Sequence, residues 1–136
     1  MGTIETTYDL PNDLTIIKAT GRMVADDIFS WSADYYTNGE ITTLHLWDIT
    51  EADLSQITPE HIIEDSRRTA RMTQVRRGGM TAVVASMNTL EFGLSRMSEA
   101  LHEIELVPIE YRLFTSMNEA MEWLFIGDNT PHLPDD

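Results

Sequence analysis

The chain has 136 residues, 42% of them hydrophobic, a formal net charge of −14 and no cysteine. This length supports one domain with its own core and is too short for two ordinary domains. The negative charge argues against a nucleic-acid binder, because phosphate contacts need clustered cations, and the absence of cysteine excludes disulfide bonds and cysteine-bound metals.

The first part of the chain predicts a β-hairpin followed by a helix. Residues 3–9 and 14–20 alternate polar and apolar side chains around the turn-forming segment Leu10-Pro11-Asn12-Asp13, which indicates two antiparallel strands. Apolar residues then recur at helical spacing from Met23 to Tyr35, with aspartates in the first turn, where the helix dipole favours anions.

A buried strand and a second helix come next. Residues 43–48 are rich in apolar and β-forming side chains, and we expect this strand to end where the acidic stretch 48–53 begins. Thr58 and Pro59 are suited to the cap and the first position of a helix that extends to about residue 73. Ile57 and Ile62 have the spacing of a hydrophobic staple around that cap.

The second half continues the alternation of strands and helices. Residues 80–85 predict an interior parallel strand, and an apolar stripe over residues 90–104 predicts a long helix. A last strand is expected at 109–114, and the capping-box pattern from Ser116 to Glu119 precedes a final helix. Residues 127–136 lack periodicity and are expected to form a flexible tail.

The order β-β-α-β-α-β-α-β-α predicts an α/β domain over residues 1–126. It requires right-handed crossovers and a mostly parallel sheet of about five strands, with an antiparallel strand from the hairpin. The sequence has no apolar run of membrane-spanning length and begins without the features of a signal peptide, so we expect a cytoplasmic protein.

The sequence contains no motif for a known reaction. The four histidines do not have metal-binding spacing, and there is no phosphate-binding glycine loop, dinucleotide fingerprint or nucleophile elbow. His45 alternates with leucines and is interpreted as a hydrogen-bonded structural residue. We therefore expect no catalytic, cofactor or metal site, and a protein that is not an enzyme.

Two surface features are candidates for binding or regulation. Five of the nine basic residues form a basic stripe, which is either an interface or a solvated helix face in which Glu64 pairs with Arg68; they are Arg67, Arg68, Arg71, Arg76 and Arg77. Ser55 and Thr58 are hydroxyl residues beside a helix N-terminus, where a phosphate group is electrostatically favoured. They serve equally well as helix caps.

Several segments together resemble the SpoIIAA-like family of small bacterial proteins, within the STAS superfamily. The resemblance covers residues 12 to 124, and its carriers are Ala19-Thr20-Gly21-Arg22-Met23, the strand Leu44 to Asp48, Phe92-Gly93-Leu94-Ser95-Arg96-Met97, Tyr111-Arg112-Leu113-Phe114, and Glu119 to Leu124. It implies a compact sheet with helices, no cofactor and no known reaction. The phosphorylated Asp-Ser-Ser-Gly of true anti-sigma-factor antagonists is replaced by Leu54-Ser55-Gln56-Ile57-Thr58-Pro59.

The residues and the resemblance leave two roles open. The first is a binding or regulatory domain that docks a protein partner, or a second copy of itself, through residues 53 to 77. The second is a carrier or sensor of an apolar small molecule or lipid, since the family also resembles Sec14-type lipid-binding folds. The candidate lining of such a pocket is Trp31, Phe92, Arg96, Met97 and Trp123.

Overall fold

The computed structural model describes residues 2–76, 78–86, 93 and 109–126. The elements in chain order are β1 (Thr3–Asp9), η1 (Leu10–Asn12), β2 (Leu14–Arg22), α1 (Ala25–Asn38), β3 (Leu44–Asp53), α2 (Pro59–Met72), η2 (Thr73–Arg76), β4 (Met80–Val84), β5 (Glu110–Phe114) and α4 (Met117–Ile126). The predicted helix over residues 90–104 and the predicted tail lie outside these residues. Within the described ranges, no helix has both the length and the apolar composition needed to cross a lipid bilayer.

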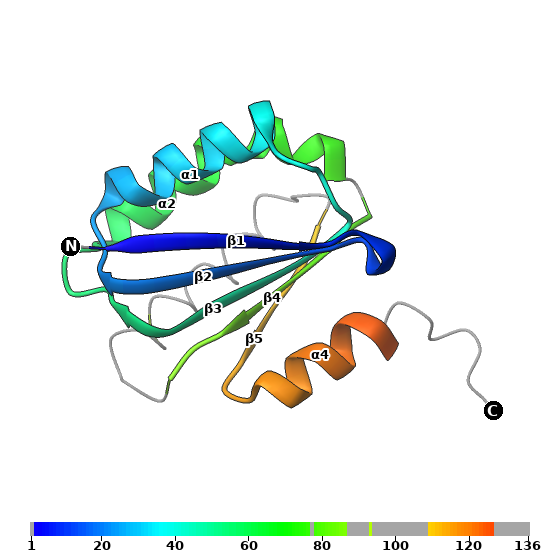
Figure 1. Cartoon of the computed structure of the whole chain (residues 1–136). Helices are drawn as coiled ribbons and strands as arrows, with labels where there is room; N and C mark the ends of the chain where they lie inside the picture. The colour runs from blue at the N-terminus through cyan, green and yellow to red at the C-terminus, as the bar shows by residue number, and fades with distance from the viewer. Residues whose placement is uncertain (1, 77, 87–92, 94–108, 127–136) are drawn as a thin grey trace.

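The strands form one sheet in the order β1-β2-β3-β4-β5, with β1 antiparallel to β2 and the other neighbours parallel. Because each parallel strand is added on the same side of the previous one, right-handed crossovers place α1 and α2 on one face. α4 follows the last strand and covers the opposite face (Figure 1). The predicted α/β architecture, with its antiparallel hairpin and interior parallel β4, is confirmed.

The hairpin turn is fastened to the start of β3. Asp13 has a positive φ of 55°, a conformation that aspartate tolerates in turns, and its N–H donates to the Leu10 carbonyl at 2.9 Å. The Asp13 carboxylate accepts the N–H of Thr43 at 3.1 Å, and its carbonyl accepts the N–H of Leu44 at 3.0 Å. One turn residue therefore aligns β2 with β3.

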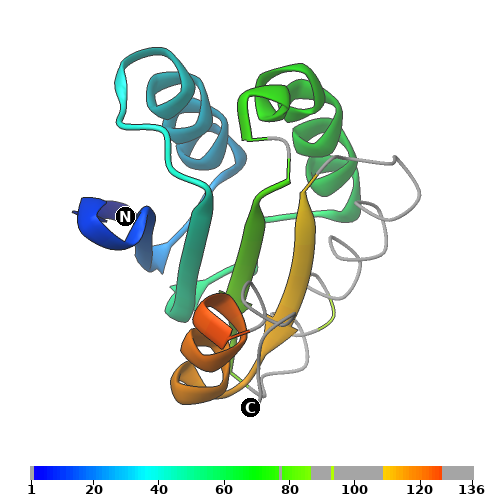
Figure 2. The same cartoon turned by 90° about the vertical axis from the view of Figure 1, so that its right-hand side faces the viewer.

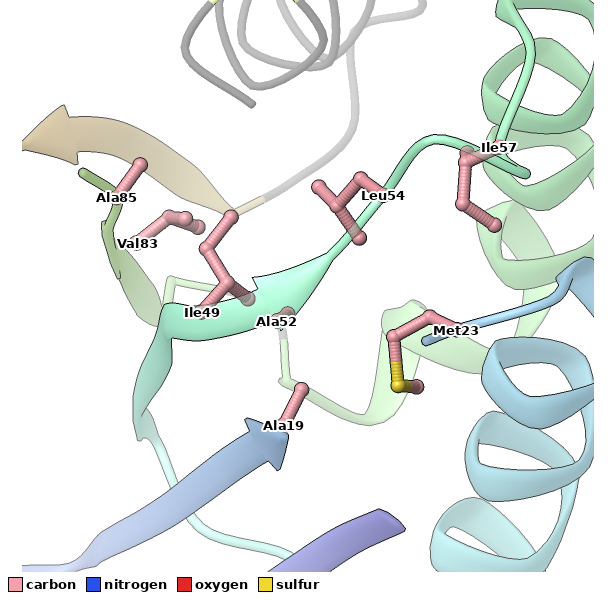
Figure 3. Close-up of a cluster of buried hydrophobic side chains, with 8 residues drawn as sticks. All are labelled: Ala19, Met23, Ile49, Ala52, Leu54, Ile57, Val83 and Ala85. Atoms are coloured by element: carbon pink, nitrogen blue, oxygen red, sulfur yellow. The ribbon is translucent and has the colours of Figure 1, made fainter. Parts of the chain in front are cut away.

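The sheet separates two hydrophobic clusters. The first lies between the sheet and the layer of α1 and α2 and contains Ala19, Met23, Ile49, Ala52, Leu54, Ile57, Val83 and Ala85 (Figure 3). The second lies between the sheet and α4 and contains Leu14, Leu44, Leu46, Met80, Ala82, Val84, Ala120 and Leu124. Every residue of β4 is buried, as expected for a parallel strand covered on both faces.

β3 is longer than the sequence indicated, because it continues through the acidic stretch to Asp53. Its register with β2 shifts between the pairs at Asp48 and Glu51, so Ile49 and Thr50 together lie opposite Ala19 in a β-bulge. The N–H and hydroxyl of Thr50 donate to the Asp48 carboxylate at 3.0 and 2.7 Å. The acidic residue that was expected to end the strand instead stabilises its bulge.

Candidate interaction surface

The loop between β3 and α2 lies at the carboxyl edge of the parallel strands and exposes Ser55. The Asp53 carboxylate accepts the Ser55 N–H at 2.9 Å and lies 3.7 Å from the Arg22 side chain. Hydrogen bonds from Ser55, and then the charge of Arg22, lower the pKa of Asp53. Leu54 and Ile57 on either side of Ser55 are buried in the first cluster, so a short polar loop is anchored at both ends.

A reciprocal pair of hydrogen bonds begins α2. Thr58 Oγ1 accepts the N–H of His61 at 3.3 Å, and His61 Nδ1 accepts the N–H of Thr58 at 3.0 Å. This is a capping box in which histidine takes the place of the usual Glu or Gln. Ile57 and Ile62 pack in the same cluster, which confirms the predicted staple. Thr58 thus serves as a cap, and its phosphorylation, like that of Ser55, stays a prediction.

The arginines of α2 differ in their surroundings. Arg68 Nε lies 3.0 Å from Glu64 Oε2, and its guanidinium lies 4.3 Å from the centre of the Phe29 ring of α1. The predicted pairing with Glu64 is therefore confirmed, and Arg68 also bridges the two helices. Arg67 is exposed one position earlier. Arg71 belongs to α2, and its side chain lies outside the described part.

The two tryptophans proposed to line one pocket lie on opposite faces of the sheet. Trp31 stacks on Tyr35 with ring centroids 4.9 Å apart and meets the edge of Trp47 at 4.8 Å, under the α1 layer. Trp123 packs against Phe114 with centroids 5.6 Å apart, on the α4 side. The structure does not bring these two residues together. Phe92, Arg96 and Met97 lie outside the described residues.

A buried polar network at the amino-terminal edge of the parallel strands was not predicted. The Tyr35 hydroxyl donates to the Glu40 carbonyl at 2.9 Å and accepts the N–H of Thr42 at 3.0 Å. It also lies 2.9 Å from His45 Nε2. Burial, and secondarily the charge of Arg76, lowers the pKa of His45 well below its usual value, so the imidazole is neutral. This agrees with the structural role expected for His45.

Arg76 is the residue for which the basic-stripe prediction was wrong, because its side chain is only 4% exposed. Its guanidinium donates to the carbonyls of Thr42, Thr43 and Met80 at 3.0, 2.8 and 3.0 Å, and to Thr81 Oγ1 at 3.1 Å. Arginine is common on surfaces, so composition gave no indication of this burial. The only signal in the sequence was the glycine pair Gly78-Gly79 that follows soon after. Glycine at position 79 lets the backbone approach the residues before β3, because a Cβ there would lie 2.5 Å from the Thr43 carbonyl oxygen.

Tyr36 adjoins Arg76, and Asp65 of α2 is close enough to Tyr36 to affect its pKa. Burial raises the pKa of Tyr36, against the opposing effect of the Arg76 charge and hydrogen bond. Burial also raises the pKa of Asp65 on α2 to about 6, against the opposing charge of Arg68. Within the described ranges, no group of three or more His, Asp or Glu side chains is placed to hold a metal ion. The network joins backbone segments and presents no exposed pair of titratable groups.

Comparison with known proteins agrees with this architecture. A scan against protein-family models found no match, and neither did a search of curated proteins. Among solved structures, the chain is similar to an uncharacterized protein of the DUF3478 family with a SpoIIAA-like fold, from Shewanella loihica PV-4. The TM-score is 0.54 at 18% sequence identity, over 90% of this chain and 93% of the other. The chain therefore has a SpoIIAA-like fold, as the sequence resemblance implied.

Proposed function

We propose that this chain is a non-enzymatic binding domain that docks a protein partner through one surface. We define the docking surface as the loop residues Ser55 and Thr58 together with Arg67 and Arg68 of α2. The observation that carries the proposal is an exposed arginine, Arg67, at the centre of α2 on a chain of net charge −14. Such a local reversal of charge favours a partner that presents carboxylates.

The docking surface is held in place before any partner arrives. Asp53 fixes the loop through Ser55, the Thr58–His61 bonds fix the start of α2, and Arg68 is held against Phe29. A surface that is already ordered loses less conformational entropy on binding. The contacts that order the docking surface therefore favour docking as well as folding.

The carrier alternative has weaker support. A single apolar pocket would need Trp31 and Trp123 on the same side of the sheet, and they lie in separate layers. Both tryptophans have ring partners that account for their positions. We therefore place the protein-docking role first.

The proposal is tested by charge reversal at the docking surface. Tagged wild-type protein should capture a partner from cells of its source, and Arg67→Glu should abolish that capture because a carboxylate would then face the partner's carboxylates. Capture by the wild type should also weaken as salt is raised, because exposed charges are screened.

Lys18→Glu is the matched control. It makes the same change of charge at a partly exposed position of β2, on the face of the sheet opposite α2, where Lys18 lies 3.4 Å from Glu51. This variant should capture the partner as well as the wild type. Equal capture by Arg67→Glu and the wild type, with both proteins folded, would refute the proposed surface.

A further inference from the structure

β1 is the edge strand of the sheet, and the direction of its free backbone groups follows from one hydrogen bond. The Asp13 carbonyl accepts the N–H of Leu44, so alternate residues of β2 starting at Thr15 face β3. The intervening residues of β2 face β1 and pair with Thr3, Glu5, Thr7 and Asp9. The N–H and C=O groups of Ile4, Thr6 and Tyr8 therefore point away from the sheet.

This edge lacks several of the devices that discourage strand pairing. β1 pairs with β2 over seven consecutive residues without a bulge, and it contains neither proline nor lysine. In both views β1 forms the outer border of the sheet, and no described element lies beside its free edge (Figures 1 and 2). The free backbone groups are thus available to another strand.

We propose that two copies of this chain associate by antiparallel pairing of β1 with β1, with Thr6 opposite Thr6 of the second copy. The outward-facing residues then match each other, because Ile4 lies opposite Tyr8 and Tyr8 opposite Ile4. Each matched pair exchanges two backbone hydrogen bonds. The two five-stranded sheets become one continuous sheet.

The charges on β1 select this register. With Thr6 at the centre, Glu5 lies opposite Thr7 and Asp9 lies opposite Thr3, so no two carboxylates face each other. Centring the pair on Glu5 places Glu5 against Glu5, and centring it on Thr7 places Glu5 against Asp9. Like charges directly opposite are destabilising, so both neighbouring registers are disfavoured.

The side chains of the matched residues support the same arrangement. Tyr8 is 38% exposed and Ile4 is half-buried, and both lie on the face of β1 that α1 covers. Pairing sets an aromatic side chain beside a β-branched one across the new strand boundary, which is a favourable cross-strand pair. A second copy of the chain supplies this pair at both ends of the strand, because Ile4 of each copy lies beside Tyr8 of the other.

The first test measures self-association by sedimentation velocity as a function of protein concentration and salt. Wild-type protein should form dimers, and the dimer fraction should rise with salt, because each copy has a net charge of −14 and salt screens the repulsion. Thr6→Pro removes an outward-facing N–H without removing a bond to β2, and should weaken the dimer at least about tenfold.

Thr6→Ala is the matched control for the proline. The Thr6 hydroxyl accepts the Trp31 Nε1–H at 2.9 Å, and both substitutions lose that bond, whereas only proline blocks the edge. Thr6→Ala should therefore dimerise as the wild type does. The thermal stabilities of Thr6→Ala and Thr6→Pro should be equal, because both variants lose the same bond to Trp31.

The second test fixes the register with cysteines, since the chain has none of its own. Glu5→Cys and Thr7→Cys proteins carrying different tags should form a disulfide with each other when mixed and oxidised, because positions 5 and 7 lie opposite at about 4.5 Å. Either variant alone should crosslink poorly, since Glu5 and its copy would be roughly 8 Å apart, beyond disulfide reach.

Protein that stays monomeric at all salt concentrations would overturn the proposal. A dimer that Thr6→Pro leaves intact, or one whose crosslinks ignore the expected register, would overturn it equally. These outcomes do not bear on the partner that Arg67 is proposed to bind, because β1 and α2 are separate surfaces.

Discussion

Arg76 shows how one buried side chain joins segments that are distant in the sequence. Its guanidinium spans the carbonyls that precede β3, at Thr42 and Thr43, and the start of β4, at Met80 and Thr81. A planar fork can reach several acceptors at once from a fixed position, whereas a lysine ammonium concentrates its donors on one atom. The charge is retained in lysine, so geometry is the property that would be lost.

Arg76→Lys should therefore lower the free energy of unfolding by about 2–4 kcal/mol, because buried carbonyls would lose charged donors. Urea unfolding measures the change, and Arg67→Lys at an exposed position of α2 should change stability by less than about 0.5 kcal/mol. Equal stability of the two variants would show that the Arg76 hydrogen bonds contribute little.

Asp65 makes stability depend on pH. The side chain is half-buried, and its Oδ1 atom is shielded from solvent. Burial raises its pKa to about 6 in the folded protein, above the value of about 3.9 in an unfolded chain. The folded state therefore binds the proton more tightly. Ionisation of Asp65 destabilises the fold increasingly as pH rises from about 4 to 6, and the full effect is present at pH 7.

Asp65→Asn removes this ionisation and should raise the free energy of unfolding at pH 7 by up to about 3 kcal/mol. The difference from the wild type should shrink as pH falls from about 6 to 4 and disappear below about pH 3, where the wild-type carboxyl is protonated in both states. Urea unfolding of both proteins across this range checks the sign. A difference that does not vary with pH would exclude titration of Asp65 as its cause.

At the scale of elements, local rules explain where α2 begins. The Thr58 cap, the proline after it and the isoleucine staple were all predicted from the sequence, because each depends on neighbours a few residues away. The partner at the third helical position was not predicted, since His61 is not a usual capping-box residue. Its Nδ1 atom accepts the Thr58 N–H that Glu or Gln would ordinarily take.

Thr58→Ala should destabilise the protein by about 1 kcal/mol, because the first turn of α2 loses a hydrogen-bond acceptor. His61→Glu should retain stability, since a carboxylate can make the same bond and is favoured near a helix N-terminus. Thermal unfolding of both variants checks this pair. A loss in His61→Glu as large as that in Thr58→Ala would show that the imidazole has a role beyond capping.

At the scale of the whole molecule, the mostly parallel sheet with its antiparallel hairpin was predictable, and the positions of the candidate pocket residues were not. Alternating strand and helix patterns, combined with right-handed crossovers, leave few arrangements of a sheet. The pocket hypothesis failed to bring Trp31 and Trp123 together because a helical stripe shows that a residue is buried without showing on which face of the sheet. Arg76 was misplaced for a related reason, since its acceptors belong to segments beyond any local pattern.

The bulge in β3 has a consequence for the length of the chain. Beyond the bulge, Ala52 and Leu54 face the helices, and Glu51 and Asp53 face away from them. This orientation depends on Thr50, which is the extra residue of the bulge and has no partner of its own on β2. A strictly alternating strand of the same length would turn the carboxylates inward. Thr50 is thus the place in this strand where evolution could delete a residue and leave both hydrophobic layers correctly oriented.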